Sequence, residues 1–105
     1  MSVTSTSFRS GSLLAGGHTP LGETKAQVLL EKNGQKVIFK TFRQGEVMPT
    51  HDAPMDVLVT VLAGRLIITV DGTPTEVEAG DYVIIPAGAP HALSCREPAR
   101  ILIYR

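Results

Sequence analysis

The stretch GDYVIIPAGAPHAL, from Gly80 to Leu93, is the most informative part of the sequence. Residues 82–85 are aromatic or β-branched, a composition that favours a strand. Residues 86–90 contain two prolines and a glycine, which end regular structure and bend the chain. His91 then opens a second extended run. The stretch therefore predicts a strand, a tight connection and a further strand that starts with a histidine.

Other runs of this kind lie on both sides of that stretch. They are VLVTVL at 57–62, LIITV at 66–70 and ILIY at 101–104. The dipeptides Asn33-Gly34 and Asp71-Gly72 separate extended runs and favour the tight turns of β-hairpins. No run between such breakers is long enough for an ordinary helix. We therefore expect seven to nine short strands in an all-β sandwich or barrel, with residues 45–50 as an irregular lead into His51.

Length and composition indicate one ordered domain. The chain has 105 residues, of which 43% are hydrophobic and 19% are charged. Ten basic and ten acidic residues give zero formal charge, so we expect no attraction to nucleic acid or to an anionic membrane. Residues 1–22, with five serines and four glycines, are predicted to be a loosely ordered segment before a domain at 23–105.

The cysteine content and the N-terminus favour a cytoplasmic location. Cys95 is the single cysteine, so the chain has no intrachain disulfide and suits a reducing compartment. The N-terminus lacks a charged region followed by an apolar core of the secretory type, and the longest apolar stretch is too short to cross a bilayer.

Several strands are apolar on both faces. In the run 57–62, Leu58 and Leu62 alternate with three valines. The side chains on one face can fill a barrel. Those on the other face must be buried against a second sheet or another subunit. The hairpin at Asn33-Gly34 offers an extra sheet edge, so we expect a homodimer formed by sheet extension or by sheet packing.

Two segments resemble the conserved motifs of the cupins. Gly45, His51 and Gly64 have the spacing of the first cupin motif, and Gly80 to His91 resembles the second almost completely. The resemblance covers residues 36–104. It implies a small double-stranded β-helix, also called a jelly-roll barrel, that is often dimeric. It also implies a metal site with two histidines and a glutamate from the first motif and one histidine from the second.

The resemblance assigns His51 and His91 to two of the four metal-ligand positions. Ala53 stands at the second histidine position and Val57 at the glutamate position, and neither side chain can bind a metal. The first metal-binding motif is therefore incomplete. A divalent transition metal (Zn, Ni, Fe, Mn or Cu) would be held at low occupancy by His51 and His91, with Cys95 as a candidate third ligand.

Alternation along a strand supplies further candidates for the site. Residues 51, 53, 55 and 57 share one face of an extended chain, and so do 91, 93 and 95. This pattern predicts a cavity lined by six residues, listed here: His51, His91, Met48, Met55, Val57 and Cys95. A plain structural role stays open for each of them, with the histidines hydrogen-bonded at a barrel rim and Cys95 as a small buried hydrophobe.

Three functions remain open at this level. The leading one is binding of a small molecule, mostly apolar or carboxylate-bearing, in a barrel with an incomplete metal site. The second is a divergent metal-dependent cupin enzyme of dioxygenase, isomerase or decarboxylase type. The third is a non-catalytic dimeric module. The residues at 53 and 57 favour the binder over the metalloenzyme, and the retained His51 and His91 disfavour a purely structural module.

Overall fold

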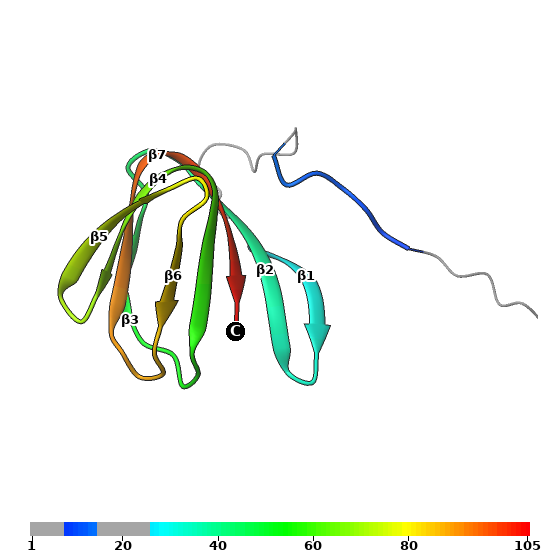
Figure 1. Cartoon of the computed structure of the whole chain (residues 1–105), viewed down its shortest axis with the longest axis horizontal. Coiled ribbons are helices and arrows are strands. Elements are labelled where there is room, and N and C mark those ends of the chain that lie inside the picture. Colours follow the sequence, from blue (N-terminus) through cyan, green and yellow to red (C-terminus); the bar gives the residue numbers. More distant parts are fainter. Residues whose placement is uncertain (1–7, 15–25) are drawn as a thin grey trace, which may run out of the picture.

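A computed structural model describes residues 8–14 and 26–105 of the chain. It confirms the predicted all-β fold, with seven strands in this part of the chain. They are β1 (Ala26–Lys32), β2 (Gln35–Phe42), β3 (Val47–His51), β4 (Val57–Val70), β5 (Thr73–Glu78), β6 (Tyr82–Ile85) and β7 (His91–Tyr104) (Figure 1). The predicted boundary between residues 22 and 23, and most of the segment before it, lie outside the described residues. Across residues 8–14 and 26–105, no helix has the length and hydropathy needed to cross a membrane.

Two long strands build the barrel. β4 and β7 have 14 residues each and pair antiparallel along most of their length. Residues 57–61 and 99–104 belong to a five-stranded layer in the order β1-β2-β7-β4-β6. Residues 65–70 and 91–97 belong to the opposite layer, in the order β3-β7-β4-β5. This is the predicted jelly-roll arrangement of two layers around one core.

Both predicted hairpin turns are present. Asn33 and Gly34 have φ values of 53° and 80°, and Asp71 and Gly72 have φ values of 49° and 79°. Two consecutive residues with positive φ match the two-residue turn whose twist suits a hairpin. These turns join β1 to β2 and β4 to β5.

The predicted strands 57–62 and 66–70 form one strand, β4, which bends at Gly64. The ladder with β7 shifts register three times between Val61 and Leu66. Gly64 has a φ of 81°, and a Cβ at this position would overlap the carbonyl oxygen of Pro98 and lie 2.5 Å from the Cα of Ala99. Only a glycine allows β4 to bend here against the crossing β7, so the strand passes from one layer to the other.

The core lies between the two layers. Its largest fully buried side chains are Val61, Leu66, Ile68 and Ile101, which are at most 2% exposed. Each of these alternates with a more exposed neighbour, which is the period of a strand with one buried face.

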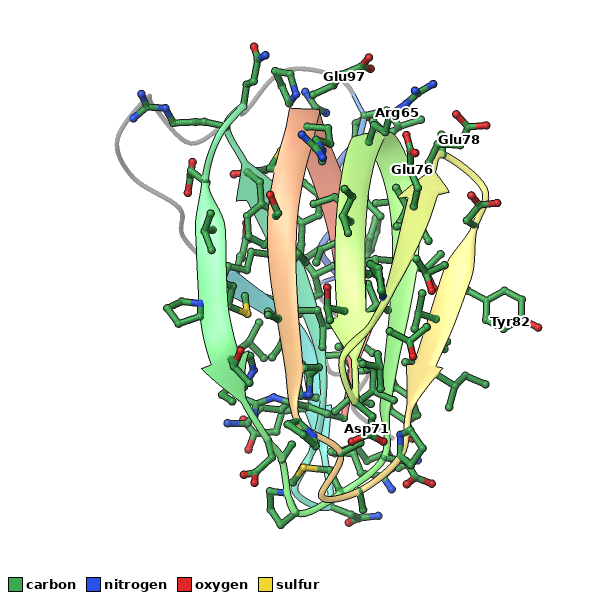
Figure 2. The ribbon with its side chains drawn as sticks, turned by 90° about the vertical axis from the view of Figure 1, so that its left-hand side faces the viewer. Arg65, Asp71, Glu76, Glu78, Tyr82 and Glu97 are labelled. Carbon is green, nitrogen blue, oxygen red and sulfur yellow. The ribbon has the colours of Figure 1, made fainter. Side chains whose placement is uncertain are left out.

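One end of the barrel carries an ion-pair cluster. Arg65 on β4 contacts Glu76 at 3.2 Å and Glu78 at 3.3 Å, both on β5 (Figure 2). All three side chains are largely exposed, so each pair contributes less than about 1 kcal/mol. The two glutamates on β5 are thus partly neutralised by an arginine from the neighbouring strand.

Candidate functional site

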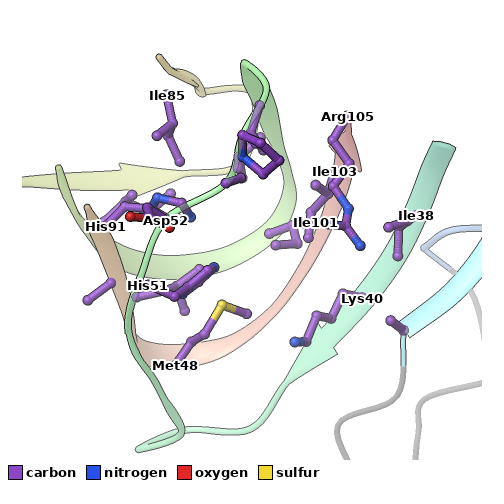
Figure 3. A pocket seen from close by; sticks show the side chains of 18 residues that line it. Ile38, Lys40, Met48, His51, Asp52, Ile85, His91, Ile101, Ile103 and Arg105 are labelled. Atoms are coloured by element: carbon purple, nitrogen blue, oxygen red, sulfur yellow. The ribbon is translucent and has the colours of Figure 1, made fainter. Parts of the chain in front are cut away.

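A cavity of about 330 Å³ lies between the two layers at the other end of the barrel. Apolar side chains from β2, β3, β4, β6 and β7 form most of its wall, including Ile38, Met48 and Val57. Five lining residues are polar or charged: Lys40, His51, Asp52, His91 and Arg105 (Figure 3). The volume is at the small end of the range for ligand pockets, and apolar walls with few polar groups are typical of such sites.

The two histidines face each other at this cavity. His51 is the last residue of β3 and pairs with His91, the first residue of β7. Their ring centroids are 4.2 Å apart and the ring planes meet at 61°. His91 is only 8% exposed, whereas His51 is exposed. The register of β3 on β7 therefore brings together the two motif histidines, which are 40 positions apart in the sequence.

Both imidazole rings are oriented by the same kind of hydrogen bond. Nδ1 of His51 lies 2.9 Å from the carbonyl oxygen of Pro49, and Nδ1 of His91 lies 3.0 Å from that of Ala89. A carbonyl oxygen only accepts, so each Nδ1 carries the proton and donates. In the neutral ring, Nε2 then keeps its lone pair. Each histidine can therefore accept a hydrogen bond from a ligand through Nε2.

Residues 52–56 form a bend over the cavity, which corrects the prediction of a strand face running from 51 to 57. The amide of Gly88 donates to the carbonyl of Ala53 at 2.8 Å, and the amide of Ala87 donates to Oδ1 of Asp56 at 2.8 Å. These bonds tie the bend to the connection between β6 and β7. Ala53 and Val57 line the cavity with His51 because of this bend, since Pro54 interrupts the extended chain.

The structure does not bring two of the predicted site residues to the cavity. Met55 is 40% exposed and lies outside the lining, because the bend at residues 52–56 breaks the expected alternation. Cys95 shares a face of β7 with His91 but lies deeper in the core, 2% exposed and outside the lining. Its thiol donates to the carbonyl of Glu97 at 2.9 Å. Burial, together with the nearby Glu46, raises the pKa of the Cys95 thiol, which disfavours the thiolate that a metal needs.

The side chains at this site do not form a complete metal-ligand set. Within residues 8–14 and 26–105, no group of three or more His, Cys, Asp or Glu side chains is placed to hold a metal ion. The two histidines are in reach of each other, but Ala53 and Val57 supply no donor atom. Two imidazoles are fewer than the three or four protein ligands of ordinary zinc sites.

Two cations of the cavity were not predicted as site residues. Lys40 on β2 and Arg105 after β7 lie on one side of the cavity, across from His51 and His91 (Figure 3). The Lys40 ammonium is 5.2 Å from the centre of the Phe42 ring. Burial lowers the pKa of Lys40, and Glu46 opposes that shift only in part. The alternation of side chains along a strand could have predicted both residues, because Lys40 lies on the same face as Ile38 and Arg105 on the same face as Ile103.

Comparisons with known proteins agree with this architecture. The family model for the cupin domain matches residues 38–104. A cupin 2 conserved barrel domain protein from Leptotrichia buccalis is 33% identical over 83% of this chain, with a TM-score of 0.77, and this chain covers 42% of that protein. A protein of unknown function from Streptococcus pyogenes is 27% identical, with a TM-score of 0.75 and coverage of 81% and 75% of the two chains. A cupin superfamily protein from Desulfitobacterium hafniense has the same fold, with a TM-score of 0.78 and coverage of 83% and 80%, at 20% identity. No curated protein matches the sequence.

The family match spans the strands that carry the histidine pair and the cavity wall. It starts at Ile38 on β2 and ends at Tyr104 on β7, so it includes His51, His91 and the bend between them. Because the family model matches residues 38–104 and the two-layered barrel agrees with it, this chain belongs to the cupin family.

Proposed function

We propose that this protein binds a small, mostly apolar molecule that carries a carboxylate, and that the cavity between the layers is the binding site. The observation that carries the proposal is the pair of cations, Lys40 and Arg105, beside a mostly apolar wall whose other polar members are Asp52 and the two histidines. Such a wall favours a hydrocarbon or aromatic body. A carboxylate would compensate the positive charges, and Arg105 in particular can bind one through two parallel hydrogen bonds.

The electrostatics of Lys40 support an anionic ligand. Desolvation lowers its pKa because the cavity wall replaces water around the ammonium. A bound carboxylate would stabilise the charged ammonium of Lys40 and so compensate for the water that burial removes. A hydrogen bond to a charged group contributes about 1.5–3 kcal/mol, equivalent to roughly a tenfold or larger gain in affinity. On the opposite side, Nε2 of His51 and of His91 would accept hydrogen bonds from a hydroxyl or amide of the ligand.

The two other functions receive less support. The metal-dependent enzyme requires donor atoms that Ala53 and Val57 do not have. The purely structural module gives no reason for a lysine to stay partly buried in an apolar cavity, where a methionine or leucine would pack without loss of hydration.

A pair of probe molecules tests the carboxylate. Hexanoate and 1-hexanol share the same chain length and differ in the head group. We expect the protein to bind hexanoate about ten times more tightly than 1-hexanol, because the head group contacts Lys40. The Lys40→Met variant keeps the apolar stem and should show a smaller preference, because only Arg105 then remains to bind the carboxylate. The dissociation constants would be measured by following backbone amide signals in NMR titrations.

Lys32→Met is the matched control for this experiment. It removes the same charge from an exposed position at the end of β1. The net charge of the protein, and with it the long-range attraction of the hexanoate anion, therefore changes equally in both variants. The control should keep the preference for hexanoate. Equal binding of the two probes by the unmodified protein, or loss of the preference in both variants, would refute the proposed role of Lys40.

The lowered pKa of Lys40 also predicts a pH dependence of binding. A lysine with an ordinary pKa of 10.5 stays charged until strongly alkaline pH, whereas Lys40 loses its proton at lower pH. Affinity for hexanoate should therefore fall as the pH rises and Lys40 loses its charge. The fall should begin at a lower pH than the one at which a lysine with an ordinary pKa loses its proton. Affinity for 1-hexanol should not follow this curve. Parallel titrations of both probes across the alkaline range would measure the difference, and a flat hexanoate curve would contradict it.

A further inference from the structure

The cavity carries opposite charges on its two sides. Lys40 and Arg105 form a cationic side, and Asp52 lines the cavity on the side of the two histidines (Figure 3). β3 ends at His51, so Asp52 is released from the alternation of a strand and lines the same cavity as its neighbour. The described residues form no ion pair between Asp52 and either cation. A negative charge therefore faces two positive charges across the cavity.

Three hydrogen-bond acceptors lie on the side of Asp52, called here the acceptor side. Nδ1 of each histidine donates to a carbonyl oxygen, which leaves Nε2 of His51 and of His91 as acceptors. The Asp52 carboxylate is the third acceptor. An ammonium has three N–H donors and a positive charge, so it can bond to all three groups. A hydroxyl has one donor and no charge, and it would leave most of these acceptors unused.

The two sides of the cavity belong to opposite layers of the barrel. His51 and His91 lie in the layer that contains β3. Lys40 lies on β2 in the five-stranded layer, and Arg105 follows β7 in the same layer, where its backbone hydrogen-bonds to β2. Packed sheets are about 10 Å apart. A ligand that contacts both sides must therefore have its polar groups at opposite ends, with the apolar wall around the part between them.

We propose that the ligand of this cavity is an amino acid whose ammonium and carboxylate are separated by an apolar chain. This inference rests on the proposed function and adds a second charged group to the ligand. The carboxylate contacts Lys40 and Arg105, the chain lies along the apolar wall, and the ammonium bonds to Asp52 and the two histidines. The reverse orientation would bring like charges together on both sides, so the ligand binds in one direction.

The separation of the charges disfavours an α-amino acid. Its ammonium is attached to the carbon next to the carboxylate, so the two groups cannot reach opposite sides of the cavity. With the carboxylate at Lys40 and Arg105, the ammonium would lie close to two cations and far from Asp52. The position of the ammonium along the chain is therefore the property that the cavity selects.

Two isomers of one amino acid test this selection. 6-Aminohexanoate and 2-aminohexanoate have the same atoms and zero net charge, so long-range attraction to the protein is equal. We expect 6-aminohexanoate to bind about ten times more tightly, because only this isomer reaches both sides of the cavity. The dissociation constants would be measured at neutral pH through backbone amide signals in NMR titrations. Equal affinity of the two isomers would overturn the proposal.

Asp52→Asn tests the acceptor side. The amide keeps an oxygen acceptor but removes the charge, so the preference for 6-aminohexanoate should fall from about tenfold to about threefold or less. Glu97→Gln is the matched control, since it makes the same change at an exposed position at the other end of the barrel (Figure 2). Both replaced residues are exposed, so both variants should fold. An unchanged preference in Asp52→Asn, or an equal loss in Glu97→Gln, would refute the role of Asp52.

A third probe separates an ammonium site from a site for a neutral donor. 6-Hydroxyhexanoate has a hydroxyl in place of the ammonium and should bind about ten times more weakly than 6-aminohexanoate. Equal affinity of these two probes would overturn the proposal in favour of a hydroxyl. Each of these failures would leave hexanoate bound more tightly than 1-hexanol. A failure of the proposed function removes that difference, so the two failures are distinguishable.

Discussion

Replacing Gly64 with alanine is expected to remove about 4 kcal/mol or more from the free energy of unfolding, enough to unfold much of the protein. The backbone at Gly64 has a φ of 81°, which is unfavourable for any residue with a Cβ. The added methyl would also overlap the carbonyl oxygen of Pro98 and press on the Cα of Ala99. Both neighbours are backbone atoms of β7, so they cannot move aside as a flexible side chain could.

Gly72→Ala provides the control for this prediction. Gly72 has nearly the same φ, 79°, but a Cβ there meets no atom within 4 Å. This variant should lose only the backbone term, about 1–2 kcal/mol. Urea denaturation of both variants would measure the difference, and the soluble yield of Gly64→Ala would report a failure to fold. Equal losses at the two sites would mean that the close approach of β7 does not matter.

The double substitution Ala53→His with Val57→Glu is expected to raise zinc affinity by at least about a hundredfold. Both positions line the cavity that contains His51 and His91, so the new side chains would join the pair. The substitutions supply the donor atoms that the family pattern places there, and affinity rises with ligand number and charge. Without metal, the buried carboxylate at position 57 should destabilise the protein by roughly 2 kcal/mol or more.

Titration calorimetry with zinc on the unmodified protein and on the double variant would measure the gain. The control adds His91→Ala to the double variant, which should abolish most of it. Thermal unfolding with and without zinc supplies a second readout, since a bound metal stabilises the folded state by mass action. A folded double variant that binds zinc no better than the unmodified protein would contradict the shared geometry of these four positions.

Local sequence signals predicted most of the fold. The hairpins at Asn33-Gly34 and Asp71-Gly72 were predictable because consecutive positive φ values suit few other residues. The continuity of β4 through Gly64 was not predictable from the sequence. A glycine between two extended runs indicates the end of a strand, unless the position of the crossing β7 is known. β3 was not predicted because it contains Pro49, and a proline usually argues against a strand. Its pairing partner, β7, lies far along the chain.

The candidate site was predictable only in part. The family motifs identified His51 and His91, and the structure places them 4.2 Å apart between ring centres. Strand alternation failed for Met55, because the bend at residues 52–56 depends on hydrogen bonds to the connection after β6. Lys40 was missed because a lysine on a half-buried strand usually reaches solvent, and only the assembled cavity shows that it does not do so fully.

The pairing of β4 with β7 has a consequence for how the protein folds. These two strands contribute to both layers, and 20 residues of chain separate the end of one from the start of the other. The central ladder therefore forms only after a long loop has closed, which slows folding relative to proteins rich in local contacts. Neither layer is complete without both strands, so neither half offers a separable cooperative unit that could fold first or open alone. The walls of the cavity thus gain and lose their order together with the whole barrel.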